Sequence, residues 1–311
     1  MDTTDFDFTW ITYFENIGYH SVSKISSGME GSVYMLVPNK LIAKVWTNKC
    51  IEDLIHLKLF FDENFSSIKA VKTPVIHEIQ CINGTLISLE NYIEGTSLED
   101  LLIISDFDTY KLAQSTIINA LYVLSEITID KNSICFRVFD ETTSFWKTHT
   151  TWKDAMMDLV CTRVLRFKHL LCHNVVELEE LLLKVACFLQ SRNTATMGLI
   201  HGDLCPCNIM VDNNFNLTGI LDFGFLTLYG DLAFDVAICA ATFNMYGNNA
   251  DEIENIMTFN LCDYFGYDIN VINRYKVIYA LLSSNAYSLD KEDGHYQWCI
   301  KMINKHRNCF L

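Results

Sequence analysis

Residues 200–211 read IHGDLCPCNIMV, and residues 219–224 read GILDFG. Each stretch joins a short apolar run of strand character to an acidic residue. Asp203 and Asn208 lie five residues apart on one tight loop, and Asp222 follows the second apolar run. A hairpin between the two stretches can bring the three side chains together. Because carboxylate and amide oxygens are hard ligands that suit Mg²⁺, the sequence predicts a magnesium site in this β-rich island.

The part of the chain before residue 96 is typical of a small antiparallel sheet. Short apolar or β-branched runs separated by turn residues predict three strands, over residues 21–27, 32–37 and 41–46. A helix is expected over residues 50–61. After it, Asn83 and Gly84 stand between two further strand-like runs, which is a strong hairpin signal.

From residue 96 onward the periodicity changes to that of amphipathic helices. We expect helices over residues 97–104, 108–127, 152–171, 175–192, 251–265 and 270–289, interrupted by the β-rich island. Half of the residues are apolar, which is enough material for a large core. The sequence therefore predicts an α+β protein of two lobes. A small β-sheet lobe with one crossing helix covers residues 1–95, and a larger, mainly helical lobe covers residues 96–311.

Composition and charge exclude several classes of partner. The chain of 311 residues carries 23 basic and 38 acidic side chains, a formal net charge of −15. This excess argues against binding of nucleic-acid phosphates and favours a cationic or neutral partner. None of the 12 cysteines forms a C-x-x-C pair, so we expect reduced thiols rather than a disulfide scaffold. No export signal or bilayer-length apolar stretch occurs, so we expect a cytoplasmic protein with no membrane partner; its oligomeric state stays open.

The order of these residues resembles that of a known family. The pattern H-x-D-x-x-x-x-N at residues 201–208, followed by D-F-G at 222–224, is found in protein-kinase-like phosphotransferases. The H-G-D form, together with GDLAFDVA at residues 230–237, is similar to the aminoglycoside phosphotransferase family. Three further stretches resemble elements of the family. GMEGSVY at 28–34 resembles the nucleotide-covering loop, and LIAK at 41–44 ends at the position of the third-strand lysine. LENYIEG at 89–95 resembles the hinge beside adenine. The resemblance implies a bilobal protein-kinase-like fold and an ATP- or GTP-dependent phosphotransferase.

The resemblance also implies a chemical role for four residues. Asp203 would accept or orient the proton of the attacking hydroxyl group. Asn208 and Asp222 would hold Mg²⁺ at the phosphates. Lys44 would contact the α- and β-phosphates from the N-terminal lobe, which makes residues 1–95 the nucleotide-binding lobe and residues 96–311 the catalytic and substrate-binding lobe.

Other matched residues are expected to bind nucleotide or to support the loop. An acid on the helix after Lys44 would align it, with Glu52 as the first choice and Asp53 as the second. Nucleotide contacts are further implied for Gly28, Gly31, Ser32, Glu90 and Tyr92. His201 would brace the catalytic loop, Asp235 would hold that loop through backbone N–H groups, and Asp231 would cap the following helix.

Two departures from protein kinases indicate a small-molecule acceptor. Gly202 stands where protein kinases have the arginine that binds a phosphorylated activation loop, and only eight residues separate Asp222 from Asp231. A negative C-terminal half would attract an amine-bearing substrate. The acids that could do so, as a group, are Asp251, Glu252, Glu254, Asp263 and Asp268. The expected substrate is a small cationic molecule with a free hydroxyl group, such as an aminoglycoside-like compound.

Two other functions stay open. Residues 221–223, followed by residues 234–239, are also similar to homoserine kinase relatives, which would make this a metabolic kinase for a homoserine- or choline-type alcohol. A nucleotide-free pseudokinase that serves as a binding module is less favoured, because Lys44, Asp203, Asn208 and Asp222 are all present.

Overall fold

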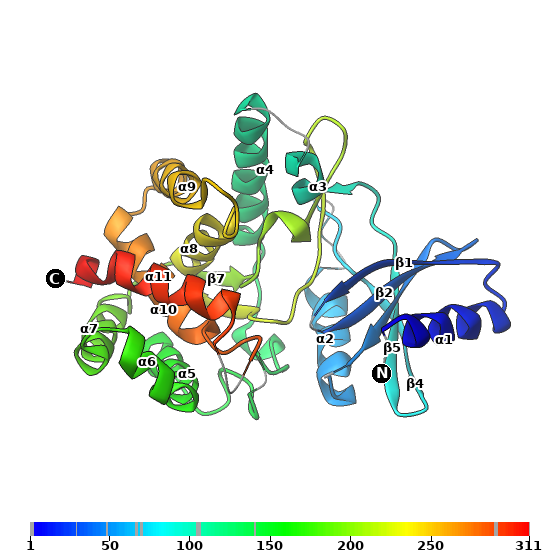
Figure 1. The fold of residues 1–311 in the computed structure, drawn as a ribbon, viewed down its shortest axis with the longest axis horizontal. Helices are drawn as coiled ribbons and strands as arrows, with labels where there is room; N and C mark the ends of the chain where they lie inside the picture. The colour runs from blue at the N-terminus through cyan, green and yellow to red at the C-terminus, as the bar shows by residue number, and fades with distance from the viewer. Residues whose placement is uncertain are drawn as a thin grey trace.

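The structure is a computed structural model, and it describes residues 3–28, 30–47, 49–65, 68, 71–103, 107–139, 141–288 and 292–310. Met29 of the expected nucleotide-covering loop, and Ile104 and Leu289 at the ends of expected helices, lie outside the described residues. The chain forms a small lobe built on a sheet and a larger helical lobe (Figure 1). The predicted α+β fold of two lobes is confirmed.

The N-lobe is built on a five-stranded antiparallel sheet with the strand order β1-β2-β3-β5-β4. Its strands are β1 (Ser21–Gly28), β2 (Gly31–Val37), β3 (Leu41–Trp46), β4 (Ile76–Ile82) and β5 (Thr85–Asn91). Asn83 and Gly84 take positive φ values in the tight turn between β4 and β5, as a hairpin turn of this sequence requires. Lys44 lies on the middle strand, paired with Val33 of β2 and Ser88 of β5.

Two helices accompany this sheet, α1 (Thr3–Asn16) and α2 (Ile51–Asn64). On α1, the ring of Phe14 packs 5.8 Å from that of Tyr34, in a separate N-lobe core. On α2, the ring of Phe61 lies 5.6 Å from that of Phe223 in the second motif. The apolar face of α2 therefore joins the N-lobe to the segment that carries Asp222.

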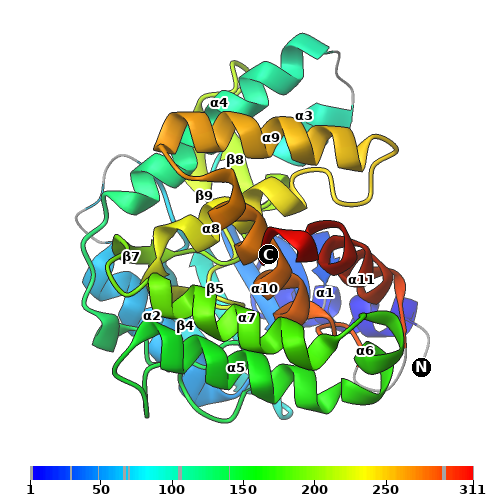
Figure 2. The same ribbon diagram turned by 90° about the vertical axis from the view of Figure 1, so that its left-hand side faces the viewer.

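The C-lobe is mainly helical. Its α-helices are α3 (Leu98–Ile103), α4 (Phe107–Ser125), α5 (Trp152–Arg166), α6 (Lys168–Asn174), α7 (Leu178–Ser191), α8 (Leu232–Thr242), α9 (Ala250–Phe265), α10 (Ile269–Ser283) and α11 (Gly294–His306). Short 3₁₀ turns are η1 (Lys131–Ser133), η2 (Pro206–Asn208) and η3 (Arg307–Phe310). Helix α8 is buried along residues 233–242, and Figure 2 shows it with α10 between α9 on one side and α5 and α7 on the other.

The β-rich island forms two short sheets that position the motifs. Its strands are β7 (Met197–Ile200), β8 (Ile209–Val211), β9 (Leu217–Ile220) and β10 (Leu228–Asp231), and β8 also pairs with β6 (Thr96–Ser97). The expected hairpin exists, because β8 and β9 are antiparallel with Ile209 opposite Ile220. The residue before β8, Asn208, and the segment after β9 therefore meet at one end of this sheet.

The structure differs from the expected helices at two places. The helix expected over residues 152–171 is broken at the buried Phe167, whose ring packs 5.4 Å from that of Tyr296. The helix expected over residues 270–289 ends at Ser283. The boundary between residues 95 and 96 stays a prediction; Thr96 begins β6, whose partner strand β8 belongs to the C-lobe.

Candidate active site

Gly202 and Asp235 determine the backbone of the catalytic loop, residues 201–208. Gly202 has φ +80°, and a Cβ atom there would lie 2.1 Å from the carbonyl oxygen of Leu226, so only glycine fits. Asp235 on α8 accepts hydrogen bonds from the backbone N–H groups of His201 and Gly202, each at 2.9 Å. Burial raises the pKa of Asp235 to about 6, although both hydrogen bonds favour its carboxylate form. The predicted role of Asp235 is confirmed.

His201 is a neutral brace between the two motifs. Burial lowers the pKa of its ring to about 4. Its Nε2 lies 2.8 Å from the carbonyl oxygen of Leu221, and its Nδ1 accepts from the backbone N–H of Asp203 at 3.2 Å. One donor and one acceptor fit the neutral tautomer protonated at Nε2. Asp231 caps α8 by accepting from the N–H of Ala233 at 3.0 Å, so both predicted structural roles are confirmed.

Asp203 and Asn208 contact each other across the loop. The Nδ2 group of Asn208 donates to Oδ2 of Asp203 at 3.1 Å and to its carbonyl oxygen at 2.8 Å, which leaves Oδ1 of Asn208 as a candidate metal ligand. Burial, followed by the charge of Asp222, raises the pKa of Asp203 to about 8, and the hydrogen bond from Asn208 opposes this rise. A carboxyl group with a pKa near neutrality can exchange a proton with a hydroxyl group.

Asp222 connects this loop to Lys44. Its φ of +61° is rare for a residue other than glycine, although aspartate tolerates it. Before it, the N–H of Leu221 donates to the carbonyl oxygen of Asn208 at 2.8 Å. Oδ1 of Asp222 lies 2.5 Å from Nζ of Lys44, and although burial opposes ionisation, the charge of Lys44 lowers the pKa of Asp222. Lys44, Asp222, Asn208 and Asp203 thus form one continuous series of neighbours.

The donor groups of this series fit Mg²⁺. Asp222 offers an ionised carboxylate, and Asn208 offers an amide oxygen. Mg²⁺ is usually held by one or two carboxylates together with substrate phosphates, not by a complete protein cage. In the described part of the chain, no group of three or more His, Cys, Asp or Glu side chains could hold a metal ion by itself. The residues therefore suit an ion that is shared with a nucleotide.

Lys44 has a different carboxylate partner from the expected one. Its Nζ lies 3.4 Å from Oε2 of Glu30 and 4.1 Å from the ring centroid of Trp46. Burial would lower the pKa of Lys44, but the charges of Asp222 and Glu30 raise it above its ordinary value. Glu52 is exposed at the start of α2, and among the described residues it makes no ion pair with Lys44. In this structure the carboxylate that contacts Lys44 from the nucleotide-covering loop is Glu30, and the aligning role of Glu52 stays a prediction.

Asp53, the second choice, serves another contact. Its Oδ2 lies 2.5 Å from Nη2 of Arg137, and both of its carboxylate oxygens lie 3.1 Å from Nε of Arg137. Burial opposes ionisation, but these hydrogen bonds lower the pKa of Asp53. This ion pair joins α2 to the C-lobe. Glu30, the carboxylate beside Lys44, also forms an ion pair with Lys49, whose Nζ lies 2.8 Å from Oε1 of Glu30.

The predicted glycine loop is a hairpin tip between β1 and β2. Gly28 and Gly31 pair with each other there. A Cβ atom at Gly31 would lie 1.9 Å from the carbonyl oxygen of Val45, so glycine allows the tip to approach β3 closely. The hydroxyl groups of Ser27 and Ser32 lie 3.1 Å apart. The contacts of this loop with nucleotide stay predictions.

Glu90 and Tyr92 lie at the end of β5. Glu90 is buried and accepts a hydrogen bond from the hydroxyl of Ser88 at 2.6 Å. Burial raises the pKa of Glu90, and the charge of Lys44 opposes that rise. Tyr92 is half-buried in the link between the lobes. Their contacts with adenine also stay predictions.

The sequence analysis missed a group of aromatic residues, which we name the aromatic cluster: Tyr246, Tyr287, His295 and Trp298. His295 stacks on Trp298 with ring centroids 5.5 Å apart, and its centroid lies 4.9 Å from that of Tyr287. Nδ1 of His295 lies 3.0 Å from the hydroxyl of Tyr246. Burial raises the pKa of Tyr287, and the charge of Asp203 raises it further. The charge of the predicted base therefore acts on one residue of the aromatic cluster. These residues share no motif, and their spacing in the sequence offers no signal.

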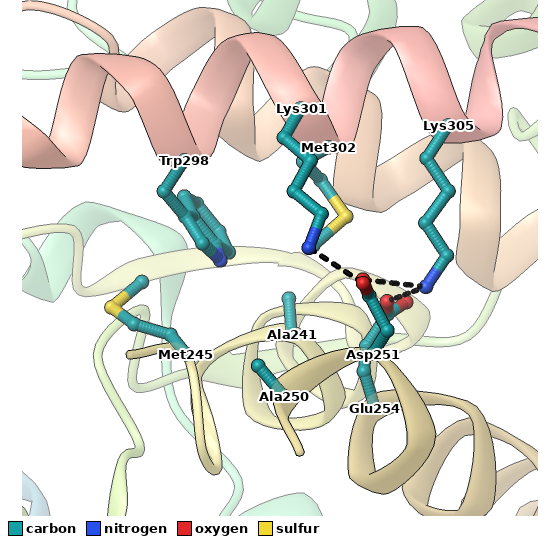
Figure 3. Close-up of a pocket in the computed structure, with 9 residues that line it drawn as sticks. All are labelled: Ala241, Met245, Ala250, Asp251, Glu254, Trp298, Lys301, Met302 and Lys305. Carbon is teal, nitrogen blue, oxygen red and sulfur yellow. Dashed lines mark hydrogen bonds and ion pairs between the residues drawn. The ribbon is translucent and has the colours of Figure 1, made fainter. Parts of the chain in front are cut away.

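Two of the acids expected to attract substrate are already paired with cations. In the pocket of Figure 3, Asp251 and Glu254 on α9 face lysines of α11. Nζ of Lys301 lies 2.5 Å from Asp251, and Nζ of Lys305 lies 2.5 Å from Glu254 and 3.3 Å from Asp251. Glu254 also pairs with the buried Lys276 of α10. We name Asp251, Glu254, Lys276, Lys301 and Lys305 the interhelical ion cluster.

This cluster stabilises the ionised form of Glu254. Burial opposes ionisation, but hydrogen bonds from His306, at 2.9 Å, and from Lys276 hold the pKa of Glu254 well below its ordinary value. Asp268 has a further structural role, since it caps α10 by accepting from the N–H of Asn270 at 2.7 Å. Of the five acids considered as a group, Glu252 and Asp263 are exposed without such a role among the described contacts.

A comparison with protein families explains this set of residues. A family model described as "Phosphotransferase enzyme family" matches residues 152–267, which include the catalytic loop, Asp222 and Asp235. This segment of the chain is therefore similar to that family. The expectation of a phosphotransferase that uses an alcohol group as acceptor is thereby confirmed. A comparison of the chain with curated protein sequences gives no match.

Solved structures match this phosphotransferase along nearly its whole length. A thermostable variant of the aminoglycoside phosphotransferase APH(4)-Ia, in a ternary complex with ADP and hygromycin B, has a TM-score of 0.74 at 13% identity and covers 97% of each chain. APH(3'')-Id from Streptomyces rimosus has a TM-score of 0.60 at 17% identity, over 90% of this chain and 98% of that one. A GDP complex of a variant of aminoglycoside 2'-phosphotransferase-IIIa has a TM-score of 0.63 at 16% identity, over 99% and 97%. This likeness confirms the bilobal, protein-kinase-like fold.

Within the described ranges, every helix is too short or too polar to cross a bilayer. The cytoplasmic location stays a prediction.

Proposed function

We propose that this phosphotransferase moves the γ-phosphate of ATP or GTP to a hydroxyl group of a small cationic molecule. The observation that carries the proposal is the ion pair between Lys44 and Asp222, because it joins a lysine of β3 to an acid of the catalytic region. Phosphoryl transfer depends mainly on positioning and on neutralising charge around the γ-phosphate. A lysine, an ionised carboxylate, an amide oxygen and a carboxyl group with a raised pKa are the groups that such a reaction needs.

In the proposed reaction, nucleotide enters between the hairpin tip of the N-lobe and the catalytic loop. Lys44 then exchanges its contact with Glu30 for the α- and β-phosphates. Asp222 and Asn208 would hold Mg²⁺, and the bound ion would supply positive charge to neutralise the phosphates. On this proposal residues 1–95 bind nucleotide, with Gly28, Gly31 and Ser32 over the phosphates and Glu90 and Tyr92 beside the base.

Asp203 is the proposed base. It accepts or orients the proton of the acceptor hydroxyl, and its backbone is held by Gly202, His201 and Asp235. Ionisation of Asp203 is opposed in the free protein by burial and by the charge of Asp222.

The choice of nucleotide rests on structural neighbours. Neighbours of the same fold were solved with ADP and with GDP, and both are consistent with a purine nucleotide as co-substrate here. Hygromycin B in one neighbour makes an aminoglycoside-like compound our first choice of acceptor. The negative net charge of −15 supports a cationic acceptor, since it raises the local concentration of cations.

The aromatic cluster favours the second candidate, a metabolic kinase for a choline-type alcohol. Tyr246 and Tyr287 are 64% and 55% exposed, so their rings are accessible to a ligand. Aromatic faces attract quaternary ammonium groups through cation–π interactions, each worth about 0.5–2 kcal/mol. In contrast, the acids of the interhelical ion cluster are already neutralised by lysines.

An acceptor panel tests the proposal. The protein is incubated with Mg-ATP or Mg-GTP and with aminoglycosides, homoserine or choline, and products are identified by the mass of one added phosphate. We expect phosphorylation of at least one cationic alcohol. Tyr287→Ala separates the two candidates, because it should raise the KM for choline and leave the KM for an aminoglycoside little changed. Absence of Mg-nucleotide binding in calorimetry would contradict the proposal and favour the pseudokinase.

A further inference from the structure

Two thiols of the catalytic loop lie unusually close together. Sγ of Cys205 and Sγ of Cys207 are 2.8 Å apart, on either side of Pro206 at the start of η2. Cys207 is exposed and Cys205 is partly buried, and both are free thiols. A disulfide bond has an S–S length of about 2.05 Å, so a small rotation of either side chain brings the two sulfur atoms within bonding distance.

The thiol pair is connected directly to the predicted catalytic residues. The N–H of Cys205 donates to the carbonyl oxygen of Asp203 at 2.9 Å, and its own carbonyl oxygen accepts from the N–H of Asn208 at 3.0 Å. The thiol of Cys207 contacts Oδ1 of Asn208 at 3.7 Å. Any covalent change at this pair therefore acts on the side-chain oxygen that is the candidate metal ligand.

We propose that Cys205 and Cys207 form a reversible modification site for oxidants of the hydroperoxide class, at which a disulfide switches off metal-dependent nucleotide binding. The thiolate of Cys207 attacks the peroxide, which breaks the O–O bond, and forms a sulfenic acid and one water. The sulfur of Cys205 then attacks the sulfenic sulfur, forming the S–S bond, while its proton and the sulfenic hydroxyl leave as a second water. In total, the two thiols lose two electrons and two hydrogen atoms, and one hydrogen peroxide is reduced to two waters.

The order of these steps follows from the surroundings of the two thiols. Cys207 meets solvent first because it is exposed. Cys205 is only partly exposed, so the peroxide reaches it less readily. Its proximity nevertheless makes it the resolving thiol, since an attacking group held beside its target has a high effective concentration.

The disulfide would weaken the metal site through Asn208. Closing the S–S bond draws Cys207 away from the amide of Asn208 and constrains η2, the turn that contains both residues. Loss of a contact that orients a metal ligand typically lowers metal affinity by about 10-fold or more. Dithiothreitol should reverse the change by thiol–disulfide exchange.

The test follows the covalent state and nucleotide binding separately. The purified 311-residue chain is treated with hydrogen peroxide, digested under conditions that preserve disulfides, and mapped by mass spectrometry. We expect a loss of about 2 Da in the peptide that contains Cys205 and Cys207, without added oxygen. In calorimetry, Mg-ATP should bind the oxidised protein about 10-fold more weakly or worse, with recovery after dithiothreitol.

Variants make each outcome decisive. Cys205→Ser and Cys207→Ser should each abolish the 2-Da loss, whereas Cys172→Ser, at an exposed cysteine of α6, should retain both the loss and its effect on Mg-ATP. Sulfinic acid at Cys207 without the S–S linkage, or a linkage to other cysteines, overturns the proposal. A mapped Cys205–Cys207 disulfide that leaves Mg-ATP binding unchanged overturns it as well. If the reduced protein itself fails to bind Mg-ATP, the proposed function is wrong. In that case, presence or absence of the Cys205–Cys207 disulfide in the peptide map decides whether the modification site exists.

Discussion

Asp203 of the catalytic loop and Glu254 of the interhelical ion cluster are both acids whose ionisation burial opposes, but their surroundings act on the two carboxyl groups in opposite ways. In the cluster, Glu254 is surrounded by Lys276, Lys305 and His306, and its pKa is held well below its ordinary value. In the catalytic loop, burial raises the pKa of Asp203 to about 8, and its side-chain hydrogen bond comes from a neutral amide. In this comparison, the lysines around Glu254 keep it ionised within the fold, whereas the raised pKa of Asp203 suits proton transfer.

This difference explains why charge counting alone misplaced part of the expected substrate site. The acids of α9 contribute to the negative net charge, yet Asp251 and Glu254 pair with lysines of α10 and α11. The net charge gives only the difference between acidic and basic residues, and it does not show which acids are paired with lysines. The following predictions test the contrast between the two regions, beginning with the largest expected effect.

Asp203→Asn should lower turnover about 100-fold or more, because the amide keeps the hydrogen bond with Asn208 but cannot accept a proton. The measurement is the steady-state rate with the acceptor that the panel identifies. Asp251→Asn is the matched control from the interhelical ion cluster, and it should leave kcat within about twofold. Equal rates for the wild type and Asp203→Asn would show that Asp203 is not the base.

Glu254→Gln should destabilise the protein by about 3 kcal/mol while leaving kcat unchanged, since removing one partner strands the buried charge of Lys276. Urea unfolding followed by circular dichroism measures this loss. Glu252→Gln, at an exposed neighbour on α9, should change stability by less than about 0.5 kcal/mol. A variant of normal stability with a greatly raised KM for the acceptor would place Glu254 in the substrate site instead.

The rate should increase with pH through the pKa of Asp203, which is about 8. The carboxyl group is protonated below this value and can accept a proton only above it, so kcat/KM should rise about 10-fold between about pH 7 and pH 9. Stability should change in the other direction. The folded pKa is raised, so the stabilising contribution of the protonated group is full below about pH 4 and is lost as the pH rises through about 8. A pH–rate profile that is flat in this range contradicts the raised pKa.

Glu30→Gln should have the smallest effect, a roughly threefold lower KM for nucleotide. Glu30 contacts both Lys44 and Lys49 in the free protein, and partly exposed ion pairs of this kind are worth up to about 1 kcal/mol. Removing its charge should favour the exchange of Lys44 from Glu30 to phosphate. Glu78→Gln on β4 is the control for loss of one surface charge. A higher KM in Glu30→Gln would mean that Glu30 positions Lys44 in the nucleotide complex.

Local patterns predicted the strands and the catalytic loop, because the information for both lies within a few residues. The three N-lobe strands and the Asn83-Gly84 hairpin follow from turn chemistry, and the resemblance to the phosphotransferase family implied the supporting role of Asp235. Contacts between distant parts of the chain were not predictable in the same way. Phe167 breaks a helix because its ring packs on Tyr296, far away in the sequence.

The partner of Lys44 illustrates the same limit. The sequence placed an acid near Lys44 on α2, but Asp53 is held there by Arg137, 84 residues away, and Glu52 faces solvent. Glu30 reaches Lys44 because a hairpin tip folds over β3, where Gly31 permits a close approach. Neither contact has a periodicity or motif that would reveal it.

The central claim is that Lys44, Asn208 and Asp222 form a single site for a nucleotide with its magnesium ion. Calorimetric titration of ATP into the wild type and into Asp222→Asn, each with and without Mg²⁺, tests it most directly. We predict that Mg²⁺ tightens ATP binding to the wild type by about 10-fold or more and has little effect on the variant. Equal tightening by Mg²⁺ in both proteins would contradict the account.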